Sequence, residues 1–385
     1  MANVIPIDIT SEELEQRSRR VAQAKHFEPV DRVPVSLGLY VRYWLPKVGG
    51  SFEEYFSDPE AMLRGQLYGQ KWVLENIQSD LGLGPIYIDF QNAQDASALG
   101  CETEVSEQNG QIWVHEGWVQ TEADLQRLRR IDPVRTGLAA KAQEFAERIR
   151  ALSDRYVVRL RDGVELRPAE KPLLTATTMG PFTVTAEVAG MVQLCTALIE
   201  RPEYARELLS IVTEKIIQWM TFCQRVQGMD ELWIADDYAG NLSPAQFREF
   251  VLPCLQRIRS HFPTLHFGFH MCGKVDHLLA ILANELRIDE FALFGYQVDK
   301  RLVQELMGGR IVLVGNVSPT NIYSGTPETV MAESLEALRV FGRGRGGFIL
   351  ADGANIPPDS PVENINALYR ATVQFAAEQA GLGTT

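Results

Sequence analysis

Short apolar runs alternate with longer amphipathic stretches along most of the chain, and this alternation predicts an α/β fold. The short runs have the length and composition that are typical of buried strands. Eight of them lie at residues 32–38, 85–90, 171–180, 230–237, 265–273, 289–295, 310–316 and 346–353. Strands that alternate with helices are expected to pair in parallel, because a parallel pair needs a crossover connection.

The count of eight strands predicts a (β/α)8 TIM barrel, in which functional residues gather at the carboxyl ends of the strands. A capping box at Thr10 and Glu13 begins a helical segment ahead of the first strand. Residues 91–170 interrupt the repeat with two predicted β-hairpins, which turn at Asn109-Gly110 and Asp162-Gly163. We therefore predict one domain over residues 1–385, with an inserted hairpin region at about 91–170.

Composition narrows the functional classes. The 385 residues have a formal net charge of −13, which argues against nucleic acid and anionic membrane surfaces as partners. The chain has no apolar run of the ~20 residues that a membrane span needs, and its first residues lack the pattern of a signal peptide. The five cysteines are scattered, so a disulfide framework is not expected. These features predict a soluble cytoplasmic protein.

The predicted strand ends carry most of the candidate chemistry. Asp236, Asp237 and Tyr238 follow one strand, and His270 and Cys272 end the next. Later strands end in Asn316 and Asp352, and Glu187 follows one turn after the third strand's Gly-Pro-Phe-Thr. In a barrel, these side chains would meet at one rim. We take Glu187, Asp236, Asp237 and Tyr238 as candidate catalytic residues.

His270 and Cys272 are a candidate metal pair. Residues two apart on a strand point to the same face, and zinc binds both imidazole nitrogen and thiolate sulfur. Two ligands alone are a weak signal, and a buried free cysteine beside a hydrogen-bonded histidine is the alternative. His261, His266 and His277 are interpreted as surface or packing residues.

Asp236 and Asp237 are adjacent, so they face opposite sides of their strand. One is expected to point into the barrel mouth while the other caps a turn or a helix. For Glu187, the alternative is an ordinary acid in the first turns of a helix, favoured by the helix dipole.

Six collinear stretches resemble the uroporphyrinogen decarboxylase superfamily. They are EPVDRVPV (28–35), MGPFTVTAEVAG (179–190), ADDYAGNLSPAQFREFVLPCLQRI (235–258), FHMCGKVDHLL (269–279), VGNVSPTNIYSGTPETV (314–330) and GGFILADGANIPPDSPVENINAL (346–368). The resemblance implies a distorted (β/α)8 barrel. It also implies one of two activities, which are cofactor-free decarboxylation of uroporphyrinogen and methyl transfer in a corrinoid-dependent system.

The motifs of the true decarboxylases are incomplete here. Of the arginines that would grip the substrate's carboxylates, only Arg42 is present, and the place of the catalytic Asp falls at Gln91, two residues after Asp89. Glu187 stands where that family has a substrate-facing Tyr, and Ala354 stands where it has a His. An acid at position 187 would repel a polycarboxylate. These departures disfavour decarboxylation.

The methyltransferase motifs match better. The resemblance implies a zinc site made by His270, Cys272 and a last-strand Cys, but that third position is Ala354. Carboxylates could replace the missing ligand, because carboxylate oxygen also binds zinc. The candidates are Asp236, Asp237, Glu187, Asp352 and, on a helix, Glu249.

The demethylating branch of these systems tolerates such a change, since it must activate a methyl donor and not a thiol. A metal or a protonated acid would stabilise the leaving atom of an ether, amine or thioether. Cobalamin on a partner corrinoid protein would accept the methyl group. Candidate substrate-binding residues are Tyr40, Arg42, Tyr43, Trp44, Asp89, Gln91, Asn316 and Asp352. For the aromatic residues among them, the alternative is hydrophobic packing.

The sequence thus predicts a corrinoid-dependent methyltransferase that acts on a small methylated substrate, with zinc and a corrinoid protein as candidate cofactor and partner. A tetrapyrrole decarboxylase and a non-catalytic relative are the alternatives. A homodimer is a further expectation.

Overall fold

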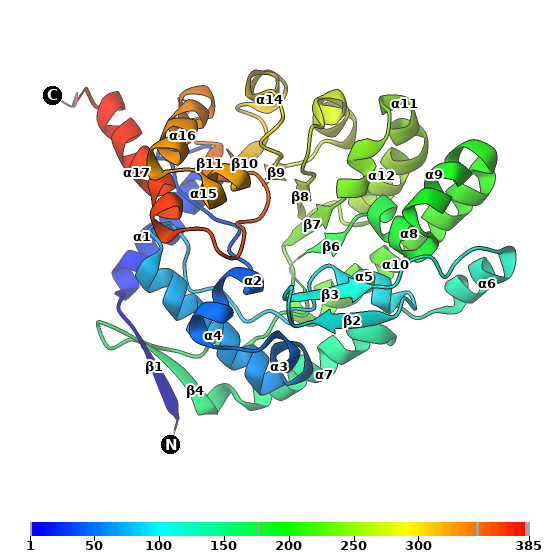
Figure 1. Cartoon of the computed structure of the whole chain (residues 1–385), viewed down its shortest axis with the longest axis horizontal. Coiled ribbons are helices and arrows are strands. Elements are labelled where there is room, and N and C mark those ends of the chain that lie inside the picture. The colour runs from blue at the N-terminus through cyan, green and yellow to red at the C-terminus, as the bar shows by residue number, and fades with distance from the viewer. Residues whose placement is uncertain (1, 176, 344–345, 382–385) are drawn as a thin grey trace.

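The structure is a computed structural model that describes residues 2–175, 177–343 and 346–381. Its centre is a parallel sheet of six strands in the order β11-β10-β9-β8-β7-β6 (Figure 1). The strands are β6 (Thr178–Met179), β7 (Glu231–Ala235), β8 (His266–His270), β9 (Glu290–Ala292), β10 (Val312–Val317) and β11 (Phe348–Asp352). They coincide with six of the eight runs that the sequence pattern predicts, so the α/β class and the parallel pairing are confirmed.

Helices connect successive strands and form an outer ring, which Figure 1 shows from α17 through α16, α14, α12 and α9. Before the sheet begins, the helices are α1 (Ser11–Lys25), α2 (Val41–Trp44), α3 (Phe52–Ser57), α4 (Pro59–Asn76), α5 (Ala93–Ala98), α6 (Glu122–Arg130) and α7 (Gly137–Ala151). Those that follow are α8 (Pro181–Ala189), α9 (Met191–Glu200), α10 (Pro202–Gln227), α11 (Pro244–Gln246), α12 (Leu252–His261), α13 (Leu279–Ile281), α14 (Lys300–Met307), α15 (Pro319–Ser324), α16 (Pro327–Phe341) and α17 (Val362–Gln379). Single π-helical turns at Phe247–Val251 and Leu282–Leu286 extend α11 and α13.

The first two predicted strands are not strands in the structure. Residues 32–38 contribute one parallel bridge, Val35 with Leu350, and residues 85–90 contribute another, Tyr87 with Leu173. Within the described part of the chain no ladder joins these two segments, so a closed eight-stranded barrel is not observed.

The backbone groups of these two segments hydrogen-bond to other residues instead of to each other. The Val35 N–H donates to the Asp80 carboxylate at 2.8 Å, and the Val35 carbonyl accepts from the Asp80 N–H at 2.8 Å. In the same way, the side-chain amide of Gln66 pairs with both backbone groups of Tyr87, at 2.9 and 2.6 Å. The backbone groups of Val35 and Tyr87 are therefore satisfied without a ladder between the two segments.

The inserted region contains both predicted hairpins. β2 (Thr103–Ser106) pairs antiparallel with β3 (Gln111–Val114), and β4 (Tyr156–Leu160) pairs antiparallel with β5 (Glu165–Leu166). The sequence pattern did not predict that β4 also pairs in parallel with β1 (Asn3–Ile7) at the start of the chain. The two ends of a 150-residue stretch therefore meet in a second, three-stranded sheet.

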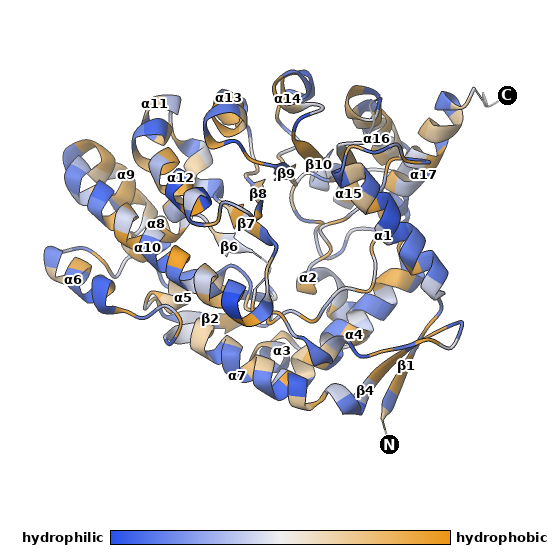
Figure 2. Cartoon of the chain, turned by 180° about the vertical axis from the view of Figure 1, so that it is seen from behind, coloured by the Kyte–Doolittle hydropathy of each residue, from blue (hydrophilic) through white to orange (hydrophobic). Residues whose placement is uncertain are grey.

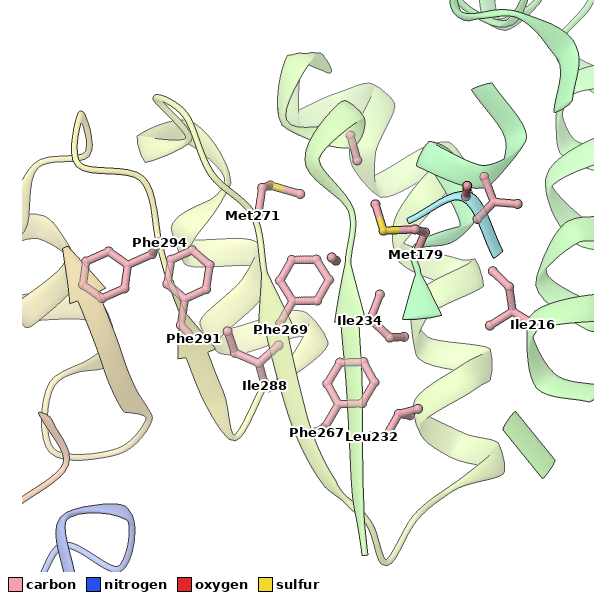
Figure 3. Packing of buried hydrophobic residues seen from close by; sticks show 14 of the residues in the cluster. Met179, Ile216, Leu232, Ile234, Phe267, Phe269, Met271, Ile288, Phe291 and Phe294 are labelled. Carbon is pink, nitrogen blue, oxygen red and sulfur yellow. The ribbon is translucent and has the colours of Figure 1, made fainter. Parts of the chain in front are cut away.

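Side chains along the central strands alternate between two faces of the sheet, and one of these faces packs into the main hydrophobic core. Figure 3 shows Phe267 and Phe269 of β8 packed beside Leu232 and Ile234 of β7, and all four are buried in the main core. The opposite face of β8 carries His266, Gly268 and His270, because side chains alternate along a strand. Gly268 is required there, since a Cβ atom would overlap the ring of Trp233.

The amino-terminal ends of the strands carry a closed charged cluster. Glu290 is 2% exposed and lies 3.1 Å from Lys25 of α1 and 3.1 Å from His266 Nε2. Burying a carboxylate in this way requires such pairing. His266 is therefore engaged in packing, as the sequence suggested, and the second histidine of β8, His270, lies at the other end of the strand.

The hydropathy of the residues differs between the outer helices and the central strands. In Figure 2 the peripheral helices, such as α6, α7 and α1, carry hydrophilic stretches, while strands β7 and β8 include hydrophobic residues. No single described helix is both long and apolar enough to cross a membrane, and α8 with α9 passes that test only as a pair bent by 104°.

Candidate functional site

Three side chains at the carboxyl ends of β7 and β8 form one cluster of metal-binding groups. One ligand atom each from Asp237, His270 and Cys272 lies within 4.8 Å of the other two. Asp237 Oδ1 is 3.4 Å from His270 Nε2 and accepts the Cys272 backbone N–H at 2.8 Å. All three residues are partly accessible. The predicted pair thus gains a third donor, and that donor is a carboxylate.

Strand register explains why these residues meet. β7 and β8 pair in parallel with Ala235 opposite His270. Asp237 and Cys272 each follow two residues later, so they continue the same face of the sheet. The short chain segments after the two strands therefore hold the cluster at the edge where parallel strands end.

The imidazole of His270 is oriented by the neighbouring strand. Nδ1 lies 2.9 Å from the carbonyl oxygen of Ala292, which can only accept, so Nδ1 carries the proton. Nε2 then faces Asp237 and Cys272. Burial lowers the pKa of His270, but its hydrogen bonds with Asp237 and Cys272 and the Asp237 charge outweigh this and raise the pKa to about 10.

Asp237 is the matching acid. Burial raises its pKa, but the hydrogen bond and charge of His270 and the hydrogen bonds with Cys272 lower it further, to about 2. Without a metal, the pair is therefore a charged imidazolium facing a carboxylate. A metal ion would replace the imidazolium proton, since histidine binds metals in its neutral form.

Asp236 points the other way, as its adjacency to Asp237 predicted. It is fully buried, and its carboxylate accepts the Thr183 N–H and the Thr183 hydroxyl, each at 2.8 Å, and the Phe182 N–H at 3.3 Å. These donors belong to the first turn of α8, so Asp236 caps that helix. Burial raises its pKa to about 7, although these hydrogen bonds oppose the shift. Gly180 permits the approach, because a Cβ atom there would overlap Asp236.

Glu187 lies on the second turn of α8 and is 8% exposed. Its Oε2 atom is buried and has no hydrogen-bond partner among the described residues. Burial, together with the charges of Asp95 and Glu116, raises the pKa of Glu187 to about 8. The charges of Glu116, Glu187 and Asp237 in turn raise the pKa of Tyr238, after burial. Tyr238 directly follows Asp237 in the chain.

Most of the aromatic residues that were predicted to line a substrate pocket are instead buried by packing. Tyr43 is 1% exposed and Trp44 is 9% exposed, and their rings make edge contacts with Trp72 and Tyr55, respectively. Tyr40 differs, because 52% of its surface is exposed. Arg42 is half-buried and has no carboxylate partner within the described part of the chain.

Asp89 and Gln91 hydrogen-bond to different parts of the fold. Asp89 accepts the Tyr55 hydroxyl at 3.2 Å, and burial raises its pKa. The side chain of Gln91 binds the hairpin, donating to the Gly110 carbonyl at 2.8 Å and accepting the Ile112 N–H at 3.0 Å. Both polar atoms of that amide are used by the fold.

Asn316 and Asp352 end neighbouring strands and are fully buried. Each keeps one oxygen without a hydrogen-bond partner in the described part of the chain. The other oxygen of Asp352 accepts the Gly38 N–H at 2.8 Å, and burial raises the Asp352 pKa to about 6. A Cβ atom built on Gly38 would meet both Asp352 Oδ2 and the ring of Tyr40, at 3.0 and 3.2 Å. These residues therefore adjoin the segment that carries Tyr40.

Two residues of this region were not among the candidates that the sequence suggested. Thr183 bridges Asp236 and the Tyr238 N–H, which reaches its hydroxyl at 3.2 Å. Asp95 accepts the Thr178 hydroxyl at 2.7 Å and the Met179 N–H at 3.0 Å. The position of Thr183 after Gly-Pro-Phe at a helix start could have suggested a capping role, whereas nothing in the sequence near Asp95 marks it. Glu249, a candidate ligand, pairs with Arg206 on the outer helices instead.

The cluster fits a zinc ion in its chemistry. Carboxylate oxygen, imidazole nitrogen and thiolate sulfur are the three zinc donors of proteins, and three protein ligands leave a fourth position open in catalytic sites. The bond from His270 Nδ1 to a backbone carbonyl is the outer contact that metal-binding histidines commonly make. Ala354 supplies no donor side chain, so Asp237 is the group available for the third place.

Comparison with known proteins gives the family and two kinds of relative. A profile of the uroporphyrinogen decarboxylase (URO-D) family matches residues 16–375. A uroporphyrinogen decarboxylase of Xanthomonas axonopodis pv. citri is 31% identical over 183 residues, which are 44% of this chain and 49% of that protein. The chain thus spans about half the length of such decarboxylases.

Methyltransferases match over nearly the full length. The methylcobamide:CoM methyltransferase MtaA of Methanosarcina barkeri is 26% identical over 376 residues, covering 93% of this chain and 98% of that protein. A solved methyltransferase structure from Methanosarcina mazei superposes with a TM-score of 0.68 at 25% identity, covering 94% of this chain and 98% of the other.

Proposed function

Because the chain belongs to the uroporphyrinogen decarboxylase family, we propose that it acts within that family as a corrinoid-dependent methyltransferase. Its reaction moves a methyl group from a small methylated ether, amine or thioether to cobalamin on a partner protein. Full-length similarity to methyltransferases, against half-length similarity to decarboxylases, supports this choice.

One observation carries the proposal. Asp237, His270 and Cys272 bring three different zinc donors together at the strand ends, where Ala354 has removed the usual third thiol. A decarboxylase of this family needs no metal, so such a cluster would have no purpose in it. A bound zinc would supply Lewis acidity to the heteroatom that carries the methyl group.

The protein's own groups have separate tasks. The Ala292 carbonyl and Asp237 orient His270, so that its Nε2 atom faces the other two groups that would hold the metal. Asp236, tied to Thr183, fixes the end of β7 and so the direction of Asp237. Preorganised ligands of this kind avoid reorganisation during the reaction.

Glu187 is proposed as the general acid. Its carboxyl is protonated at neutral pH, since its pKa is about 8. When the methyl carbon leaves, the bonding pair stays on the donor heteroatom, and the proton of Glu187 neutralises that atom. A buried acid with a raised pKa is suited to this role. Tyr238, which follows Asp237 in the chain, is proposed to position the leaving group.

Substrate contact is assigned to residues that have exposed surface or a polar group without a partner in the described chain, and to an acid beside them. Tyr40 is half exposed, and Arg42 has no carboxylate partner in the described chain. Asn316 and Asp352 retain unpaired acceptor oxygens, and Asp89 adjoins the same segment. Tyr43, Trp44 and Gln91 would support these residues from behind.

The test is a methyl-transfer assay with the purified protein. Cob(I)alamin, prepared with a chemical reductant under anaerobic conditions, is mixed with methyl ethers, methylamines or methyl thioethers, and methylcobalamin is followed by its absorbance. We expect transfer from at least one class, its loss in Cys272→Ala, and its retention in Cys195→Ala, which removes a thiol on α9. No transfer from any class, or release of CO₂ from uroporphyrinogen instead, overturns the proposal.

A further inference from the structure

A basic groove lies between the start of α14 and the last turns of α16, outside the site described above. Its volume is about 780 Å³, which is within the range of small-molecule sites. Its lining residues are Val298, Asp299, Lys300, Arg301, Glu336, Arg339, Val340 and Arg343. Four of these are cationic and two are acidic, in a chain with 50 acidic and 37 basic residues.

Both acids of the groove are already engaged. The Asp299 carboxylate accepts the N–H groups of Arg301 and Leu302, at 2.8 and 3.3 Å, and so caps α14. Glu336 lies 3.5 Å from the ammonium group of Lys300. Each acid thus has a partner other than the three arginines, and the four cationic and two acidic lining residues leave a formal charge of +2.

The three arginines have no counter-charge of their own. Among the residues that the structure describes, no carboxylate lies within 4 Å of the guanidinium groups of Arg301, Arg339 or Arg343. All three are exposed at the groove. Like charges held together are costly in free energy, and an anion bound among them would remove that cost.

We propose that this groove binds a small polyanion whose charge is carried by phosphate or carboxylate groups. Guanidinium groups bind both kinds of group through paired hydrogen bonds. Val298 and Val340 are the groove's apolar lining residues, and no aromatic residue in the described part of the chain lines it, so recognition rests on charge and not on ring stacking. This site does not depend on the methyl-transfer proposal.

The experiment is titration calorimetry of the full chain with pyrophosphate, and separately with citrate, at low and high salt. We expect saturable binding that weakens as salt rises, since the contacts are ionic. Arg339→Gln combined with Arg343→Gln should weaken binding roughly tenfold or more, because hydrogen bonds to charged groups are lost. The matched control is Arg19→Gln with Arg130→Gln, two exposed arginines on α1 and α6.

The outcomes separate clearly. Tighter binding of pyrophosphate than of citrate identifies a phosphate site, and the reverse identifies a carboxylate site. Equal weakening in both double variants would mean that net charge, and not the groove, attracts the anion, which overturns the proposal. Absence of saturable binding for either anion at low salt overturns it as well. Circular dichroism of both variants checks that they fold.

Discussion

Asp237 and His270 face each other from the ends of neighbouring strands, with carboxylate oxygen and imidazole Nε2 3.4 Å apart. The same carboxylate oxygen accepts the backbone N–H of Cys272, whose thiol completes the cluster. A residue that the family's usual ligand pattern does not include thus lies where a third ligand is needed. The predictions below follow from this arrangement and from the acids around it.

Metal binding should depend on all three residues. We expect Asp237→Ala, His270→Ala and Cys272→Ala each to lower zinc affinity by more than about 100-fold, because loss of even an outer contact can cost 10- to 100-fold. Zinc content after chelator competition measures this. Glu249→Ala is the control, since that acid pairs with Arg206 away from the cluster. Unchanged affinity in Asp237→Ala would exclude the carboxylate as a ligand.

A thiol at position 354 should replace the carboxylate. The family resemblance puts the usual third ligand there, and thiolate binds zinc strongly. We expect Ala354→Cys to restore zinc binding to Asp237→Ala, with the thiolate–metal absorption of a cobalt-substituted sample as the readout. Ala354→Ser is the matched control and should restore less. If the Cys variant restores nothing, position 354 does not face the cluster.

The raised pKa of Glu187 gives stability a definite pH dependence. The carboxyl has a pKa of about 8 when folded and 4.5 as a free side chain, so the folded state holds its proton across that interval while the unfolded chain releases it. Stability therefore falls as pH rises from 4.5 to 8, and the cost is complete above 8. Glu187→Gln should remove this cost.

We expect the Glu187→Gln protein to be more stable than the unsubstituted chain at pH 9, by a free energy on the order of 3 kcal/mol, and nearly equal at pH 5. Urea unfolding at both pH values provides the measurement. Identical pH profiles for the two proteins would show that Glu187 is ionised in the folded state, and would also remove it as a general acid.

Asp236 should contribute to the stability of the fold as a helix cap and not as a zinc ligand. Asp236→Ala leaves the Thr183 hydroxyl and the buried N–H groups of α8 without an acceptor, so we expect a loss of about 2–4 kcal/mol in unfolding free energy. Asp230→Ala, at an exposed position just before β7, is the control and should change stability little. A comparable loss in both variants would mean that the cap contributes nothing special.

Much of the secondary structure, and the direction of several site residues, could be predicted from the sequence alone. The alternation of apolar runs with helices predicted six of the strands and their parallel pairing, and the turns Asn109-Gly110 and Asp162-Gly163 predicted both hairpins. Spacing of two on a strand predicted that His270 and Cys272 share a face. Because Asp236 and Asp237 are adjacent in the sequence, they were predicted to point to opposite faces. These are local properties, which follow from backbone geometry and side-chain alternation.

Contacts between distant segments decided the rest. β1 pairs with β4, and the backbone of Val35 and Tyr87 hydrogen-bonds to the side chains of Asp80 and Gln66. These contacts join residues that are far apart in sequence, so no local pattern encodes them. The choice of Asp237 over four other acids also required the register of β7 against β8. Local sequence sets which way a side chain points, but only the packed fold sets which groups it meets.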